Sequence, residues 1–194
     1  MRWMPWLLAG LPGLAYAHLD TTGLGPVYDG VSHLLLSPDD LVPVLAMAAL
    51  AGLNGPAAGR RTLFALTIAW LAGGLAGWAL GRPAIPGAAT IASFLALGVL
   101  VALDRRLSPI VLSSIAAALG LLHGWLNGTG IAGAGREALA LVGIGSAVFV
   151  IVALAAAWAL VVAHGWPRIA VRVFGSWVAA VGLLMLGWSL RSVG

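Results

Sequence analysis

Cysteine and lysine are both absent from this chain of 194 residues, and each absence removes a class of chemistry. Without cysteine, disulfides, thiolate metal sites and thiol catalysis are excluded, so any metal site must use nitrogen and oxygen ligands. Without lysine, the chain has no phosphate-binding loop of the GxxxxGKS/T kind, whose lysine contacts the phosphates of a nucleotide. The chain therefore carries no such ATP-driven motor of its own.

Charge of either sign is also scarce. Only 8% of the residues are charged and 61% are hydrophobic, with a mean hydropathy of +1.05, whereas soluble proteins have roughly a quarter of their residues charged. The ten basic residues are all arginine and stand singly or in pairs between apolar runs. This pattern is typical of membrane loops and not of a nucleic-acid-binding surface. We therefore expect an all-α, polytopic integral membrane protein with no nucleic-acid partner.

The first 17 residues, MRWMPWLLAGLPGLAYA, have the layout of a secretory signal peptide. One arginine precedes an apolar stretch that is too short to span a bilayer comfortably, and small residues flank Tyr16 at its end. We expect cleavage after Ala17, which leaves residues 18–194 as a single transmembrane helical domain. An uncleaved first helix is the alternative.

Six apolar runs follow, each near the roughly 20 residues that cross a bilayer core as a helix. They cover residues 40–57, 62–81, 85–103, 108–127, 138–163 and 171–190. Turn residues and charges separate them, including Asn54-Gly55-Pro56, Asp104-Arg105-Arg106 and Gly128-Thr129-Gly130. The sequence therefore predicts about six transmembrane helices, with a short periplasmic or re-entrant helix before the first span.

Arginine is unevenly divided between the predicted loops. With the mature N-terminus outside, the cytoplasmic side receives Arg60, Arg61, Arg105, Arg106, Arg168 and Arg172, and the exterior receives only Arg82, Arg136 and Arg191. This division agrees with the positive-inside rule. We expect a multi-pass protein of a bacterial inner membrane with a periplasmic mature N-terminus.

Side chains that can bind metal precede the first apolar run. Asp29 and His33 are spaced i, i+4, so if Pro26 begins a short helix, both project from one face in a chelating geometry. An interfacial helix with an incidental ion pair is the alternative interpretation.

Asp39 and Asp40 follow Ser37-Pro38 at the start of the first run. Acidic residues in the first turn of a helix complement the positive end of its dipole, after a serine cap and a proline at the first position. Helix structure alone is therefore sufficient to explain both residues, and a metal role for either stays open.

His123 lies inside an apolar run, and Asn127 follows it at i, i+4 spacing on the same helix face. Polar side chains at such depth usually face a bundle interior and mark a pathway. A hydrogen bond between packed helices is the alternative for this pair. By the predicted orientation, the pair approaches the exterior end of its helix.

His18 gains a second metal-binding group if the signal peptide is removed. Its α-amino nitrogen, with a pKa of about 7.7–8.0, is readily deprotonated by a bound metal and joins the imidazole on one ion. Asp20 can add an oxygen. We expect His18 to converge with Asp29, His33 and His123 at the periplasmic mouth, where imidazole and carboxylate without sulfur suit Ni²⁺, Co²⁺ or Zn²⁺. Asn127 and Asp40 are possible additional members of this group.

Two stretches carry a resemblance to a known family. Ala17-His18 followed by DGVSHLLLSPDDLVPVLAMAALAGL resembles the N-terminal signature of the HupE/UreJ family, and LLHGWLNG resembles its second motif, a His-Gly-x-x-His-Gly pattern inside a later helix. The family's members are regarded as nickel permeases that serve hydrogenase and urease maturation. The resemblance implies metal roles for His18, Asp29, His33 and His123.

The chain departs from the family pattern in both stretches. Three residues separate Asp29 from His33, where the commoner form has adjacent Asp and His, and Asn127 replaces the histidine of the second motif. These differences are those of a divergent branch.

The expected function is that of a secondary permease for divalent transition-metal ions. Nickel is the main expected cargo, and cobalt is the next. The same ligands admit Zn²⁺ and Cu²⁺. The expected partners are the metal ion and the lipid bilayer, and a homo-oligomer stays open. An intramembrane zinc-dependent hydrolase is the main alternative, although no clear glutamate general base lies near the cluster. A metal-sensing or assembly subunit is a further alternative.

Overall fold

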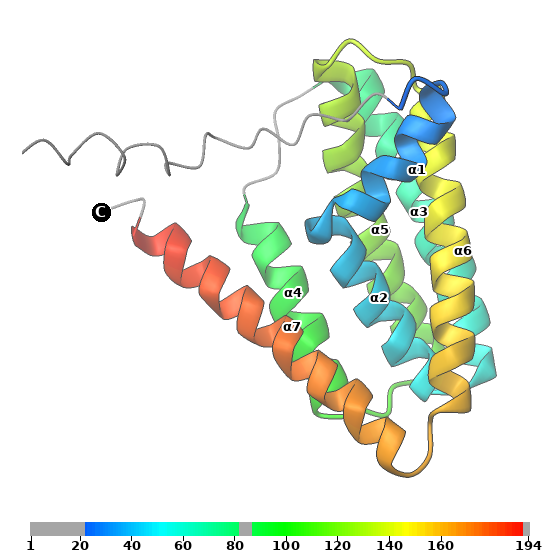
Figure 1. The fold of residues 1–194 in the computed structure, drawn as a ribbon, viewed down its shortest axis with the longest axis vertical. Coiled ribbons are helices and arrows are strands. Elements are labelled where there is room, and N and C mark those ends of the chain that lie inside the picture. Colours follow the sequence, from blue (N-terminus) through cyan, green and yellow to red (C-terminus); the bar gives the residue numbers. More distant parts are fainter. Residues whose placement is uncertain (1–21, 82–86, 192–194) are drawn as a thin grey trace, which may run out of the picture.

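The structure, a computed structural model, describes residues 22–81 and 87–191, and every regular element within them is an α-helix. The helices are α1 (Pro26–Leu36), α2 (Pro38–Leu53), α3 (Pro56–Leu80), α4 (Ala88–Ala102), α5 (Pro109–Gly133), α6 (Leu139–Val161) and α7 (Trp166–Arg191). Figure 1 shows α4 and α7 as a pair beside the bundle of the other five. The predicted signal peptide, His18 and Asp20 lie outside the described residues.

Four helices, α3, α5, α6 and α7, are each long and apolar enough to cross a membrane. The bent pair α1–α2 adds a fifth span if its two helices are counted together. Helix α4 has only 15 residues and is shorter than a typical span. The all-helical membrane architecture is confirmed, with four to five spans in the described residues, and the sixth predicted span stays a prediction.

Many large apolar side chains are exposed on the surface of the bundle. Leu154, Val161 and Leu184 are 68%, 80% and 75% exposed, and aromatic rings such as Trp177 are exposed with them. Exposed apolar area on this scale marks a surface that contacts other apolar material. The chain is therefore a membrane protein that presents this surface to lipid.

Proline begins four of the helices, at Pro26, Pro38, Pro56 and Pro109. Its fixed φ suits the first helical position, where an N–H has no partner within the helix. The predicted helix that follows Pro26 is confirmed as α1. It meets α2 at a bend of 74°, because Pro38 restarts the helix after the extended Ser37.

Helices α3 and α5 run parallel and make the most extensive contact of the bundle. Gly73 of α3 faces the backbone of Leu121, and Gly77 faces that of Trp125 one turn later. A Cβ atom on Gly124 of α5 would lie only 2.2 Å from the carbonyl oxygen of Trp70. These glycines let the two backbones approach closely, as small residues commonly do in membranes.

The predicted break at residues 128–130 is wrong, because α5 continues to Gly133. A Cβ atom on Gly128 would lie 2.0 Å from the carbonyl oxygen of Gly74, so this glycine serves the contact with α3 rather than a turn. One further difference concerns the start of α3. It begins at Pro56, so Arg60 and Arg61 lie in the helix and not in a loop. Its end agrees with the predicted run to residue 81, because Gly81 adopts a left-handed conformation at φ 54°.

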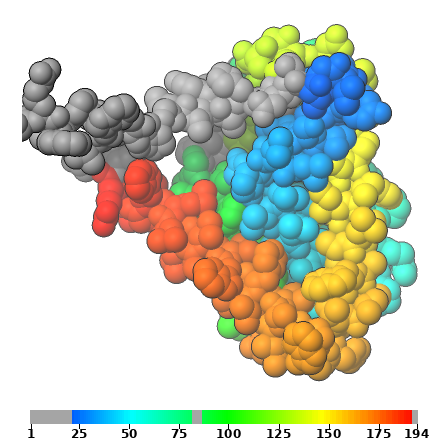
Figure 2. All heavy atoms as spheres, viewed as in Figure 1, coloured from blue at the N-terminus to red at the C-terminus, as the bar shows by residue number. Residues whose placement is uncertain are grey.

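Helix α6 packs against both parts of the bent pair. Gly30 of α1 lies against Ala140 near the start of α6, and Gly52 of α2 lies against Ala156 near its end. The pair α1–α2 therefore runs along the bundle in the same overall direction as α6. Figure 2 shows α2 and α6 in direct contact on the surface, with the start of α1 at the upper end.

The connections α2–α3, α4–α5 and α6–α7 all lie at one end of the molecule, which we call the arginine end (Figure 1). It includes Arg60, Arg61, Arg105, Arg106, Arg168 and Arg172. Arg168 donates to both carboxylate oxygens of Asp104 at 2.6 Å, and Arg106 donates to the carbonyl of Leu53 at 3.0 Å. The hydrogen bonds from Arg168 hold the pKa of Asp104 below its ordinary value.

Candidate metal-binding site

Asp40 is the centre of a buried polar cluster inside the bundle. It lies in the first turn of α2 and is only 3% exposed. Nδ1 of His123 lies 2.8 Å from its Oδ1, and Nδ2 of Asn127 donates to its Oδ2 at 2.8 Å. His123 and Asn127 share one face of α5, as their spacing predicted, and both reach the same carboxylate.

His33 joins this cluster from α1. Its Nε2 lies 3.7 Å from Oδ2 of Asp40, and its Nδ1 lies 3.3 Å from the hydroxyl of Ser37. The bend between α1 and α2 places His33 over the first turn of α2. Ser37 occupies the cap position of α2, but its side chain makes no capping hydrogen bond and contacts the imidazole instead. The break in the helix pair therefore serves the cluster directly.

The imidazole of His123 is held on two further sides. Trp70 of α3 stacks on it, with ring centroids 5.6 Å apart and an interplanar angle of 29°. Ser93 of α4 places its hydroxyl oxygen 3.2 Å from Nε2. With Asp40 at Nδ1, helices α2, α3 and α4 together fix the ring that α5 supplies.

Ser93 bridges the backbone of α4 and the imidazole. Its hydroxyl donates to the carbonyl of Thr90 at 2.7 Å, and the same oxygen lies 3.2 Å from Nε2 of His123. The 2.8 Å contact between Nδ1 of His123 and Oδ1 of Asp40 contains one hydrogen, which the two groups share.

Two buried polar atoms beside His123 have no hydrogen-bond partner among the described residues. They are Oδ1 of Asn127 and Nε1 of Trp70. An unsatisfied buried group costs about 1–3 kcal/mol, and such groups are uncommon in folded proteins. Oδ1 of Asn127 is an oxygen acceptor adjacent to the Asp40 carboxylate, so it can coordinate a cation without breaking a hydrogen bond to a described residue.

Within the described part of the chain, no group of three or more His, Cys, Asp or Glu side chains stands ready to hold a metal ion. The physical reason is that the candidate ligands are paired with one another. Nδ1 of His123 and Oδ1 of Asp40 share a hydrogen bond, so the hydrogen between them occupies a position that a metal ion bound by both atoms would need. An ion held by this pair must displace that hydrogen.

Of the other predicted site residues in the described part of the chain, Asp29 lies apart from this cluster, and Asp39 is next to Asp40 but makes no hydrogen bond to the cluster. Asp29 accepts hydrogen bonds from the backbone N–H and the hydroxyl of Thr22 at 2.6 and 2.7 Å, and Arg136 lies 3.7 Å away. Asp39 is exposed, whereas its neighbour Asp40 is buried. His33 thus turns toward Asp40 rather than pairing with Asp29 as the i, i+4 spacing had indicated.

The depth of the cluster also differs from the prediction. His123 lies near the middle of α5 (Pro109–Gly133), whereas the predicted end of that helix placed it close to the exterior mouth. Ser93 and Trp70 were not predicted as site residues, because each stands in an apolar run that contains no His, Asp or Glu. Only the tertiary contact of α3, α4 and α5 places them beside His123.

Comparison with known proteins gives one match. A family model described as HupE / UreJ protein matches residues 6–185, which is nearly the whole chain. No curated protein and no solved structure matches the chain.

Proposed function

This chain belongs to the HupE/UreJ family of membrane transporters, and from that premise we propose that it is a secondary permease for divalent transition-metal ions, with nickel as its main cargo. The family is associated with nickel and cobalt transport. Its members are permeases and not enzymes, so the intramembrane hydrolase is excluded. No observation favours the alternative of a metal-sensing subunit.

One observation supports the proposal above all others. Two imidazoles, from His33 and His123, approach opposite oxygens of one buried carboxylate, Asp40, in the interior of a membrane bundle. A buried ionisable group among membrane helices is costly and usually functional. Imidazole, carboxylate and amide oxygen form a sulfur-free donor set that suits Ni²⁺, Co²⁺ and Zn²⁺.

The arrangement also fits a carrier that must release its cargo. Asp40 is the only acidic residue in the cluster, and the hydrogen bonds of His123 and Asn127 compensate its charge when no ion is bound. Binding displaces the proton shared by Asp40 and His123, and the return of a proton restores the hydrogen bonds and favours release.

In this proposal, His33, Asp40, His123 and Asn127 hold the ion inside the bundle. His18, Asp20 and Asp29, together with the exposed Asp39, attract the hydrated ion at the outer face. The signal peptide is removed, and the arginine end faces the cytoplasm of a bacterial inner membrane. The distribution of arginine supports this orientation.

The test compares three purified variants, His33→Ala, His123→Ala and His164→Ala, by calorimetric titration with Ni²⁺ and Co²⁺. We expect the first two to lose high-affinity binding while the protein stays folded. His164 is exposed at the α6–α7 connection and serves as the control, so its variant keeps the wild-type affinity. Unchanged affinity in the His33 and His123 variants would contradict the proposal.

A further inference from the structure

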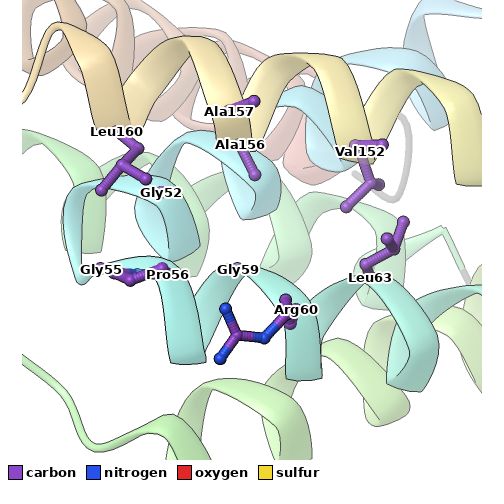
Figure 3. A pocket seen from close by; sticks show the side chains of 11 residues that line it. Gly52, Gly55, Pro56, Gly59, Arg60, Leu63, Val152, Ala156, Ala157 and Leu160 are labelled. Atoms are coloured by element: carbon purple, nitrogen blue, oxygen red, sulfur yellow. The ribbon is translucent and has the colours of Figure 1, made fainter.

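A hollow of about 220 Å³ opens on the surface of the bundle where the α2–α3 turn meets α6 (Figure 3). Most of its wall is glycine, alanine and proline, and the larger apolar side chains that line it are Leu63, Val152 and Leu160. Small side chains leave space between the backbones of α3 and α6 here. The hollow therefore follows from the packing of α3 and α6 beside the α2–α3 turn.

Arg60 is the one charged side chain among the described residues that line this hollow. It is exposed, and the structure gives it no hydrogen bond or ion pair with another described residue. The neighbouring Arg61 is exposed in the same way. By contrast, Arg106 and Arg168 at the same end of the molecule donate to protein oxygens. The hollow thus combines an apolar wall with a cation that no described protein group neutralises.

The order of these groups along α3 matches the order of groups in a phospholipid. Arg60 lies in the second turn of the helix, at the arginine end of the molecule. Leu63 and Val152 extend the wall from there toward the middle of the bundle. A phospholipid likewise places its phosphate at the surface of the bilayer and its acyl chains beneath it.

We propose that this hollow is a binding site for an anionic phospholipid, whose phosphate pairs with Arg60 and whose acyl chain lies on the wall between α3 and α6. Guanidinium groups bind phosphate oxygens through charge-assisted hydrogen bonds. A zwitterionic phospholipid carries a compensating positive charge in its headgroup, so it gains less from Arg60. The site is therefore selective for lipids with a net negative charge.

A second copy of the chain fits the hollow less well than a lipid does. Copies related by a two-fold axis along the membrane normal bring the same surface of each chain to the same depth. Arg60 and Arg61 of one copy would then approach the same two residues of the other. Such a contact adds like charge, whereas a phosphodiester adds the opposite charge.

The test uses the purified full chain in detergent, without metal, and measures lipid binding by native mass spectrometry. Phosphatidylglycerol is compared with phosphatidylcholine of the same acyl chains. Arg60→Gln removes the charge, Arg60→Lys keeps it, and Ala157→Leu fills the hollow from an exposed position on α6. Arg105→Gln is the matched control, because Arg105 is exposed at the same end but does not line the hollow.

We expect the wild type to prefer phosphatidylglycerol and the Arg60→Gln variant to bind it about tenfold more weakly, a loss of about 1.4 kcal/mol. The Arg60→Lys variant retains most of the preference for phosphatidylglycerol. Ala157→Leu weakens the binding of both lipids, and Arg105→Gln binds both lipids as the wild type does. Equal losses in the Arg60→Gln and Arg105→Gln variants would indicate diffuse surface attraction and overturn the site. Unchanged lipid binding in the Ala157→Leu variant would overturn the site as well. So would a dimer of the wild type that the Arg60→Gln or the Ala157→Leu substitution dissociates.

Discussion

Two carboxylates, Asp40 and Asp104, show two different ways of placing an acid in this bundle. Asp104 lies at the arginine end and receives two 2.6 Å hydrogen bonds from one guanidinium, that of Arg168. Asp40 lies inside the bundle and is held by an imidazole and an amide, with a second imidazole at 3.7 Å. The first carboxylate has a permanently charged partner, and the second does not.

The difference concerns what each carboxylate can exchange. Arginine keeps its charge at any accessible pH and holds a carboxylate bidentately, so the Asp104–Arg168 pair closes the α4–α5 connection onto α7 and stays closed. Imidazole loses its proton near neutral pH and then offers a lone pair to a metal. Asp40 therefore has partners that can become ligands, and Asp104 has a partner that cannot.

The largest expected effect on metal binding follows from removing the charge of Asp40. We expect Asp40→Asn to lower Ni²⁺ affinity by at least about a hundredfold, because it removes the only carboxylate of the cluster, and 1.4 kcal/mol corresponds to a tenfold change. Asp39→Asn is the matched control, since Asp39 precedes Asp40 but is exposed. Calorimetric titration measures both variants. Equal losses of affinity would mean that a general negative charge at the bend, and not Asp40, binds the ion.

Replacing His33 by arginine tests the same comparison in the opposite direction. His33→Arg gives Asp40 a permanently charged partner like that of Asp104, and the partial exposure of His33, 15% of its side chain, leaves room for the longer side chain. We expect metal uptake in cells to cease while the melting temperature stays the same or rises. His33→Ala also loses uptake but gains no stability. Uptake retained in the arginine variant would show that transport tolerates a permanently charged partner of Asp40 at position 33.

The sequence was sufficient for the helical membrane class because proline and glycine mark the helix starts and the apolar runs are long. It was also sufficient for the shared face of His123 and Asn127, because helical spacing is local information. Their metal role stays a prediction. Asp40 could not be separated from Asp39 in this way, because both suit the first turn of a helix equally and only the fold buries one of them.

Tertiary contact explains what sequence patterns missed. The glycines at residues 128 and 130 have the composition of a turn, yet α3 packs on Gly128 and the helix continues. Asp29 and His33 share a helix, but the bend before Pro38 turns His33 toward α2, while Thr22 and Arg136 hold Asp29. Neither the bend angle nor these partners can be read from local spacing.

The α3–α5 contact is a further difference between the two carboxylates. It positions Trp70 against His123, the partner of Asp40, and no such contact among the described residues supports the partner of Asp104. Gly124→Ala places a Cβ atom 2.2 Å from the carbonyl oxygen of Trp70, so the two helices must separate. We expect a loss of stability of about 1–3 kcal/mol, as is typical of overpacking, together with weaker metal binding. Gly130→Ala, also in α5, meets nothing within 4 Å and serves as the control. Melting temperature and calorimetry measure both effects, and equal stability of the two variants would contradict the close contact.

The smallest expected effect is at Asp104, whose role in the comparison is structural. Asp104→Asn should lower stability at neutral pH by about 1 kcal/mol or less, since the pair with Arg168 is partly exposed, and should leave metal affinity unchanged.

The hydrogen bonds from Arg168 lower the pKa of Asp104 in the folded state. Its stabilising contribution is therefore fully present above the unfolded pKa of about 3.9 and is lost as pH falls through the folded pKa. The difference in melting temperature between wild type and variant should be constant near neutral pH and shrink below about pH 4. A difference that persists at low pH would mean that the Asp104 carboxylate is not what holds Arg168, and a loss of Ni²⁺ affinity in this variant would mean that the two carboxylates are coupled rather than separate in function.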